Sequence, residues 1–287
     1  MKKNPVYEIQ HFKHHSHQNE LYVNTFKSHL KEHSFIEEPH RHNFYVLVLF
    51  TKGTGVHEID FDTFEINAGS LFIIQPGQIH NWELSTDIEG YIIFYSQEIY
   101  NLYFGSKKIE DYPFYQSVKN KPEIQLNEIE LHQIKSYFDL MIAENQGNNL
   151  KKEDKLLNLL DIIHIEISRK YLSENDHAIP TYNYKIKQFE KFLEQHYKLE
   201  KSPSFYATKM NITLKHLNRI CKNILNETAT EMITKRIILE AKRMLIDKNK
   251  TVSEIADELG YINYSYFAKL FKKYSGLTPT EFRSNLK

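Results

Sequence analysis

The first 125 residues consist of short apolar runs separated by turn residues. Gly, Pro, Asn and Asp interrupt these runs about every ten residues, which is typical of an all-β sandwich or barrel. The longest run, residues 44–50, predicts a buried strand. Further strands are expected at residues 56–61, 64–66, 71–74 and 91–94. The pattern predicts a β domain over residues 1–125.

The apolar residues then take up a helical spacing. One face of a first helix, which ends near Gly147, is marked by Leu131, Ile134, Phe138 and Met141. A second helix, residues 153–172, is apolar on nearly every side and needs cover from more than one direction. We expect one of its faces to pack on the β domain and another to meet the same helix of a second subunit. Residues 126–173 are then a helical dimerisation segment; a helix enclosed between two domains is the alternative.

A polar segment without periodicity, residues 174–182, predicts an interdomain linker. The chain is then helical from residue 183 to its end. Residues 203–223 and 251–274 are expected to form two helix-turn-helix units, joined by a long helix over residues 230–246. The fold class is therefore multidomain, with a β-rich N-terminal domain, trailing helices and an all-α C-terminal domain.

The two helical units repeat each other. Residue types agree at positions 49 apart in the first helix and turn, and 50 apart afterwards. The aligned pairs include Ala207 with Ala256, Asn211 with Gly260, Leu217 with Phe267, Cys221 with Phe271, Thr228 with Thr278 and Glu231 with Glu281. A small residue lets two helices cross closely, a turn residue ends the first helix, and apolar residues fix the second on the core.

The second helix of each unit has an outer face suited to DNA. Thr213 and Asn263 are placed to cap these helices. The inward side is expected to carry Leu214, Leu217 and Cys221 in the first unit, and Phe267, Leu270 and Phe271 in the second. The outer faces then carry Lys215, Asn218, Arg219 and Lys222 in the first unit, and Tyr264, Ser265, Ala268, Lys269 and Lys272 in the second. Arg and Asn side chains can pair bidentately with base edges, whereas lysine more often meets phosphate.

The distribution of charge also points to a nucleic-acid partner. The whole chain has a net charge of zero, but residues 201–287 carry 16 Lys and Arg against 8 Asp and Glu. Residues 1–200 carry 21 against 29. The basic segment coincides with the repeated units, which favours double-stranded DNA as the partner. If the connecting helix is rigid, the two outer faces should enter adjacent major grooves about 34 Å apart.

Three segments carry a resemblance to a known family: IADELGY (255–261), SYFAKLFKK (265–273) and GLTPTEFR (276–283). They resemble the C-terminal signature of the AraC/XylS family of transcription regulators. The resemblance extends over about residues 186–283 and includes Arg236 and Ala241 on the connecting helix. It implies that the outer faces contact DNA. Tyr264 departs from the small polar residue often found at its position, which affects the expected base preference.

The N-terminal segments PHRH (39–42) and GSLFIIQPGQIH (69–80) resemble a cupin barrel, the sensor domain usual in that family. The resemblance implies a cupin-like barrel that binds a small effector. His40, His42 and His80 could supply facial ligands to Fe, Zn or Ni. A metal-dependent cupin normally offers a glutamate soon after the second histidine, and residues 43–48 contain no carboxylate. We therefore expect these three histidines and Trp82 to line an effector pocket and to hold no metal, so that loss of His40 and His80 leaves the metal content unchanged.

The remaining features restrict location and chemistry. The N-terminus has no apolar run behind its lysines and the longest apolar run is far too short for a bilayer, so neither a signal peptide nor a membrane partner is expected. A single cysteine, Cys221, predicts no disulfide framework, which fits the cytoplasm. Cys221 falls on the buried side of its helix, so a redox role is not expected. The histidines at 11, 14, 15 and 17 lack a second ligand cluster and are not expected to form a metal site.

We therefore expect a cytoplasmic transcription regulator without a cofactor, which binds double-stranded DNA and a small effector and forms a homodimer. Contact with RNA polymerase is a further expectation. Two alternatives remain open. One is a constitutive DNA-binding regulator whose barrel only dimerises. The other is a metal-dependent cupin enzyme with an appended helical domain, against which the missing glutamate argues.

Overall fold

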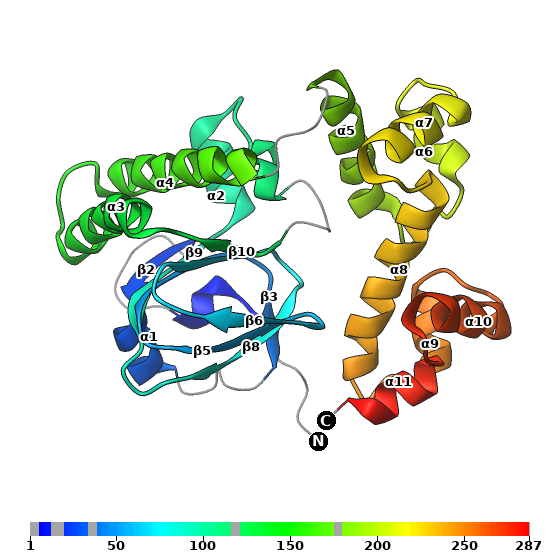
Figure 1. Cartoon of the computed structure of the whole chain (residues 1–287), viewed down its shortest axis with the longest axis horizontal. Coiled ribbons are helices and arrows are strands. Elements are labelled where there is room, and N and C mark those ends of the chain that lie inside the picture. The colour runs from blue at the N-terminus through cyan, green and yellow to red at the C-terminus, as the bar shows by residue number, and fades with distance from the viewer. Residues whose placement is uncertain (1–5, 13–19, 34–38, 116–120, 175–179, 287) are drawn as a thin grey trace. The chain divides into compact units, whose positions relative to one another are not determined.

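A computed structural model describes residues 6–12, 20–33, 39–115, 121–174 and 180–286 of the chain (Figure 1). The chain divides into two compact units. The N-terminal unit contains the strands and the helices through α4, and the C-terminal unit contains helices α5 to α11. No helix in the described ranges has the length and apolar content that a membrane span requires.

The strands of the N-terminal unit form two five-stranded sheets. The first has the order β1 (Val6–Tyr7), β3 (His40–His42), β8 (Ile79–Leu84), β5 (Gly55–Ile59) and β6 (Asp62–Ile66). The second has the order β10 (Glu123–Gln125), β7 (Ser70–Ile74), β4 (Tyr45–Lys52), β9 (Glu89–Tyr95) and β2 (Leu21–Thr25). No strand pairing joins the two sheets in the described residues, so the expected barrel is a pair of separate sheets and not one closed cylinder.

The apolar run at residues 44–50 is buried because β4 is covered on both faces. Val46, Val48 and Phe50 pack with Ile59 and Trp82 of the first sheet in a core between the two sheets. The alternate residues of β4 face the opposite way, where Tyr45, Leu47 and Leu49 pack in a second core. A strand covered on both faces can be apolar at every position. The sequence prediction of a buried strand here is confirmed.

Two long helices cover the outer face of the second sheet: α3 (Glu128–Gln146) and α4 (Lys152–Glu174) (Figure 1). Nearly all the apolar residues of α4 are covered within this unit. Those exposed by less than a tenth are Leu156, Leu157, Leu159, Leu160, Ile163 and Ile167. Ile162, by contrast, is 36% exposed. The abundance of apolar residues along α4 is thus explained by packing inside one chain, and does not by itself require a second subunit.

Several elements of this unit were not expected from the sequence. They are β1, β2, β3, β8, β10, the helices α1 (Phe26–Glu32) and α2 (Gln97–Phe104), and three short 3-10 turns at Ile9–Phe12, Ile109–Asp111 and Pro113–Tyr115. The expected strand at 56–61 ends at Ile59, because Asp60 adopts a left-handed backbone (φ 55°) and turns the chain into β6. The ends of the expected linker 174–182 are helical, since α4 ends at Glu174 and α5 begins at Pro180.

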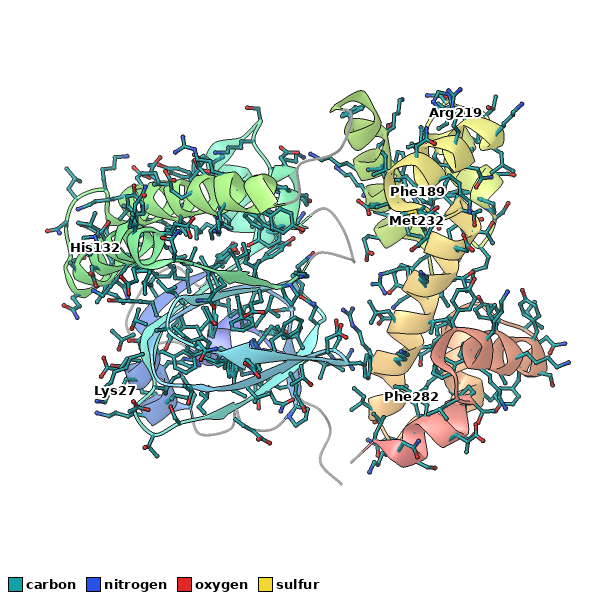
Figure 2. All side chains as sticks on the ribbon, in the orientation of Figure 1. Lys27, His132, Phe189, Arg219, Met232 and Phe282 are labelled. Atoms are coloured by element: carbon teal, nitrogen blue, oxygen red, sulfur yellow. The ribbon has the colours of Figure 1, made fainter. Side chains whose placement is uncertain are left out.

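The C-terminal unit consists of seven helices around one core: α5 (Pro180–His196), α6 (Pro203–Lys209), α7 (Leu214–Leu225), α8 (Ala229–Ile246), α9 (Val252–Glu258), α10 (Tyr264–Ser275) and α11 (Pro279–Asn285). The long α8 joins the two repeats, as expected from the sequence. It contributes Met232, Ile233, Ile237 and Ala241 to the shared core. Figure 2 shows Phe189 of α5 and Met232 of α8 inside this core.

Candidate nucleic-acid interface and buried histidine cluster

The two repeats in the C-terminal unit have the same turn. Asn211 and Gly260 both adopt a left-handed backbone, with φ of 53° and 76°. The N–H of Ile212 donates to the carbonyl of Ala207 at 3.0 Å, and the N–H of Tyr261 donates to that of Ala256 at 2.9 Å. Asparagine is one of the few residues with a side chain that tolerate this conformation, and glycine adopts it without a Cβ penalty. The sequence alignment at an offset of 49 is therefore confirmed in the backbone.

The helices that follow the turns are also matched, at an offset of 50. Both α7 and α10 have 12 residues. The Thr213 side chain accepts a hydrogen bond from the His216 N–H at 3.2 Å, and the Asn263 side chain accepts one from the Tyr266 N–H at 3.0 Å. At their C-terminal ends, Asn226 and Gly276 adopt left-handed caps. The predicted capping roles of Thr213 and Asn263 are thus confirmed.

One side of each helix is anchored in the core. Leu217 and Cys221 of α7 and Phe267 and Phe271 of α10 are completely buried. The burial that the sequence predicted for these four residues is confirmed. Leu214 was also expected to point inward, but it is 36% exposed. A helical side chain covers the turn that precedes it, and Leu214 is the first residue of α7, so no such turn lies beneath it.

The opposite side of each helix is cationic. Neither α7 nor α10 contains an aspartate or glutamate. Exposed positive side chains are Lys215, Arg219 and Lys222 on α7, and Lys269, Lys272 and Lys273 on α10. Figure 2 shows Arg219 at the outer surface of this unit. A helix face that has exposed cations and no carboxylate of its own attracts the phosphate backbone of a nucleic acid.

The other residues expected on these faces differ in how far they are available. Asn218 is half-buried, and its side-chain oxygen accepts a hydrogen bond from the Ala229 N–H at 3.0 Å. Tyr264 is 41% exposed, Ser265 is exposed and Ala268 is half-buried. Two exposed apolar side chains, Tyr266 at 58% and Ile262 at full exposure, were not predicted from the sequence. The prediction rested on polar residue types, although an apolar side chain can contact a thymine methyl.

The N-terminal unit places the four residues of the expected effector pocket together, but in its interior. His40 and His42 lie on β3, and His80 and Trp82 lie on the neighbouring β8, with His40 paired directly with His80 in the antiparallel register. All four side chains are exposed by 3% or less. A bound effector that touches them therefore requires the surrounding side chains to move.

A fourth histidine, His57 on β5, completes what we call the buried histidine cluster (His40, His42, His57 and His80). His57 is fully buried and lies opposite Trp82 in the strand register. Its Nε2 lies 3.1 Å from Nδ1 of His80, whose own Nε2 lies 2.8 Å from Nε2 of His42. His57 was not predicted from the sequence, because no motif includes it. The available signal was its position two residues before Ile59, which puts both side chains on the same face of the strand.

Burial also determines the charge of these imidazoles. Loss of solvation lowers the pKa of His42, His57 and His80 well below the ordinary range, and neighbouring histidines lower it further. These rings are therefore neutral at pH 7, and each has one protonated and one unprotonated nitrogen.

Both units match known protein families. Residues 206–285 match the model of a helix-turn-helix domain, and residues 21–160 match the model of an AraC-like ligand binding domain. The chain belongs to the AraC/XylS family of transcriptional regulators. It is a DNA-binding regulator and not an enzyme.

Relatives of the AraC-family chain are similar to it over most of their length. The HTH-type transcriptional activator RhaR of Mannheimia succiniciproducens is 23% identical over 247 residues, which are 85% of this chain and 86% of the relative. The activator RhaS of Salmonella arizonae is 21% identical over 249 residues, with the same coverage. A structure of ToxT from Vibrio cholerae covers 92% of this chain and 98% of its own, with 12% identity and a TM-score of 0.44.

The buried histidine cluster of this AraC-family regulator also has the donor atoms of a metal site. One ring nitrogen each from His40, His42 and His80 lies within 4.8 Å of the other two. Neutral imidazole nitrogens suit first-row transition ions. The residues present therefore fit such an ion, even without the glutamate whose absence argued against it in the sequence.

The single cysteine lies in the other core. Cys221 is fully buried, and burial raises the pKa of its thiol to about 12. The thiol therefore stays protonated at neutral pH, which makes it a poor nucleophile and a poor metal ligand.

Proposed function

We propose that this regulator activates transcription by placing α7 and α10 in adjacent major grooves of one DNA duplex. The observation that carries the proposal is the duplication: two 12-residue helices with the same caps, the same buried side and a carboxylate-free cationic outer side. Both helices pack on the same long helix α8, which holds them in one unit. Activation is inferred from the activator relatives. A cytoplasmic location and a contact with RNA polymerase are further parts of the proposal.

Within this interface, Arg219 is the residue we assign to base reading. Its guanidinium has five donors in a fork that matches two acceptors on guanine. Lys215, Lys222, Lys269 and Lys272 are assigned to phosphates, with Tyr264, Ser265 and Ala268 along the groove-facing side of α10. Asn218 has its amide NH₂ group left for DNA, because its oxygen is already used by Ala229.

The test uses DNA fragments enriched by the full-length protein from a random pool. Arg219→Ala should cost about 1–3 kcal/mol of binding to the preferred sequence and relax the preference at one position. Lys222→Ala should weaken binding to all sequences similarly and reduce the salt dependence by about one counterion. Lys191 is exposed on α5 of the same unit, so Lys191→Ala is the matched control and should change neither. Equal effects of Arg219→Ala and Lys191→Ala would refute the assignment.

We also propose that the N-terminal unit binds a small effector and that the protein acts as a homodimer. The AraC-like ligand binding domain match over residues 21–160 supports the effector. For the dimer, the supporting observation is a pair of exposed apolar side chains on α3, Ile129 at 80% and Leu140 at 48%. Eleven residues are close to three full helical turns, so these two side chains share one face. Ile129→Glu with Leu140→Glu should convert the dimer to a monomer in sedimentation velocity; a wild-type monomer would contradict the proposal.

A further inference from the structure

The orientation of α10 relative to α7 decides which two stretches of DNA, its half-sites, one chain can contact together. In the C-terminal unit, α7 packs mainly on α5, α6 and α8, whereas α10 packs mainly on α8, α9 and α11. Both repeats therefore meet on one long helix, α8 (Figure 1). Two bodies attached to a single rod can turn about its axis, and a second link away from that axis restrains the rotation.

A second link lies in the connection between α5 and α6. Lys201 is in this connection, and its Nζ lies 5.3 Å from the ring centre of Tyr261, in the turn of the second repeat. An ammonium within about 6 Å of an aromatic ring is attracted to the ring face. The same Nζ donates to the backbone carbonyls of Tyr197, at 2.9 Å, and of Lys198. The three N–H groups of Lys201 thus have three partners, two carbonyls next to α5 and one ring of the second repeat.

The turn of the second repeat approaches this connection closely. A Cβ on Gly260 would lie 2.5 Å from the carbonyl oxygen of Lys198 and 3.0 Å from Nζ of Lys201. The left-handed backbone does not by itself require glycine, because Asn211 adopts it at the same place in the first repeat. Glycine at position 260 therefore makes room for the contact with Lys198 and Lys201.

Both ends of the link are anchored. On one side, the Tyr206 hydroxyl of α6 donates to the Glu200 carbonyl at 2.8 Å, which ties the connection to the first repeat. On the other side, the Tyr261 ring is 9% exposed and its centre lies 5.3 Å from that of Phe267 in α10. Direct contacts therefore run from α6 through Lys201 to α10.

We propose that Lys201 is a positioning residue for DNA recognition: it holds α10 in one orientation relative to α7 and thereby fixes the spacing of the two half-sites. The orientation concerns the C-terminal unit alone, whereas the spacing rests on the proposed DNA interface. Burial lowers the pKa of Lys201 to about 8, with Glu200 opposing the shift, so most of its side chains are charged at pH 7. The ammonium is the form that the two carbonyls and the Tyr261 ring attract.

The orientation is tested without DNA, by pulsed electron paramagnetic resonance of the full-length protein. Asn223→Cys and Lys273→Cys place spin labels at exposed, matched positions of α7 and α10. The native Cys221 is buried and its thiol stays protonated, so it does not compete for the label. Dilution with unlabelled protein restricts the measured distances to one chain.

We expect one narrow distance distribution in the wild-type background. Lys201→Met keeps the aliphatic stem but removes the charge and the donors, so the distribution should broaden or shift. Lys201→Arg keeps both the charge and the donors and should retain the narrow distribution. The same distribution in Lys201→Met as in the wild type would overturn the positioning role.

The spacing is tested on the DNA site that the wild-type protein selects. One base pair inserted between the half-sites moves them apart by about 3.4 Å and rotates them by about 35°. A fixed pair of α7 and α10 cannot follow this change, so the wild type should bind the lengthened site about tenfold more weakly or worse, as for a lost base contact. In Lys201→Met α10 can turn with its half-site, so the penalty should fall to about threefold or less.

Lys209 provides the matched control. Its Nζ lies 5.6 Å from the ring centre of Phe205, but both residues belong to α6 in the first repeat. Lys209→Met should leave the label distances and the spacing penalty unchanged. An unchanged penalty in Lys201→Met, or an equal change in Lys209→Met, would overturn the role of Lys201 in spacing. A wild type without any spacing preference would contradict the proposed placement in adjacent grooves, and the label distances then decide the orientation separately.

Discussion

The backbone N–H of Ala229, the first residue of α8, donates to the side-chain oxygen of Asn218 on α7, with a distance of 3.0 Å. The first N–H groups of a helix have no partner within the helix, so this bond satisfies one of them. It also ties the recognition helix to the helix that connects the two repeats. Asn218 therefore has a structural role on a helix whose lysine and arginine side chains are exposed.

The first prediction separates the two roles of Asn218. Asn218→Ala leaves the Ala229 N–H without its acceptor and should lower the free energy of unfolding by about 1–2 kcal/mol in urea denaturation. Asn218→Asp keeps an acceptor oxygen and should restore most of that stability. The aspartate should nevertheless weaken DNA binding, because it puts a negative charge on a cationic face. Wild-type stability of Asn218→Ala would show that the bond contributes nothing.

The second prediction concerns the turn of the second repeat. Gly260 has φ of +76°, and a Cβ there would lie 2.5 Å from the carbonyl oxygen of Lys198. Gly260→Ala should therefore lower the free energy of unfolding by more than the roughly 1–2 kcal/mol that a left-handed alanine costs. Asn211→Gly, at the same place in the first repeat, is the matched control and should change stability by less than about 1 kcal/mol, because asparagine already tolerates this conformation. Similar results for both variants would mean that the Lys198 contact is irrelevant.

The sequence predicted the C-terminal unit better than the N-terminal one, for physical reasons. Paired positions such as Asn211 with Gly260 and Thr228 with Thr278 determine the turn and the caps locally, and such local signals can be recognised in a single sequence. The strand β4 could also be predicted, because a strand that is buried on both faces carries few polar residues. In contrast, β3 and β8 carry the polar side chains His40 and His80 inward, so apolar alternation could not reveal them.

The same limit explains the missed site residues. His57 meets His80 only through the pairing of β5 with β8, a non-local register that no spacing along the chain shows. Leu214 was misplaced because helical spacing gives a direction around the axis but does not show where the supporting core ends. The glutamate missing after His42 is visible in the sequence, but only the structure shows that three histidine nitrogens come together without it.

The third prediction concerns Arg236 of α8, which is 6% exposed. Its guanidinium donates to Glu194 at 2.7 Å and to Glu240 at 3.1 Å, and lies 4.0 Å from the ring centre of Tyr197. Arg236→Ala leaves Glu240 without this partner in the interior and should cost about 3–5 kcal/mol of stability. Arg236→Lys should recover only part of it, because an ammonium lacks the planar fork. Glu194 is 48% exposed, so Glu194→Gln should cost far less in the same denaturation experiment.

The last prediction is a pH dependence of stability that arises from His164 on α4. Its Nδ1–H donates to the Leu160 carbonyl at 2.8 Å, so Nε2 is an acceptor. The Tyr95 and Tyr115 hydroxyls lie 2.9 and 3.1 Å from Nε2 and also hydrogen-bond to each other, so one of them donates to Nε2. Burial is the main reason that its pKa falls from 6.5 to about 4; Lys107 also lowers it, while Leu160 and Asp161 oppose the shift.

Between these two pKa values the unfolded chain binds a proton that the folded chain does not. The contribution of neutral His164 to the free energy of unfolding is therefore fully present above about pH 6.5. It declines as the pH falls towards 4, by up to about 1.4 kcal/mol per pH unit. His29, whose pKa falls to about 3, contributes with the same sign. His164→Gln should reduce the slope of the free energy of unfolding against pH over this window, as measured by urea denaturation. The reduction should correspond to at most one bound proton. Exposed His132 on α3 provides the control, since His132→Gln should leave the slope as it is. An unchanged slope in His164→Gln would show that the buried His164 ring is not a source of the pH dependence.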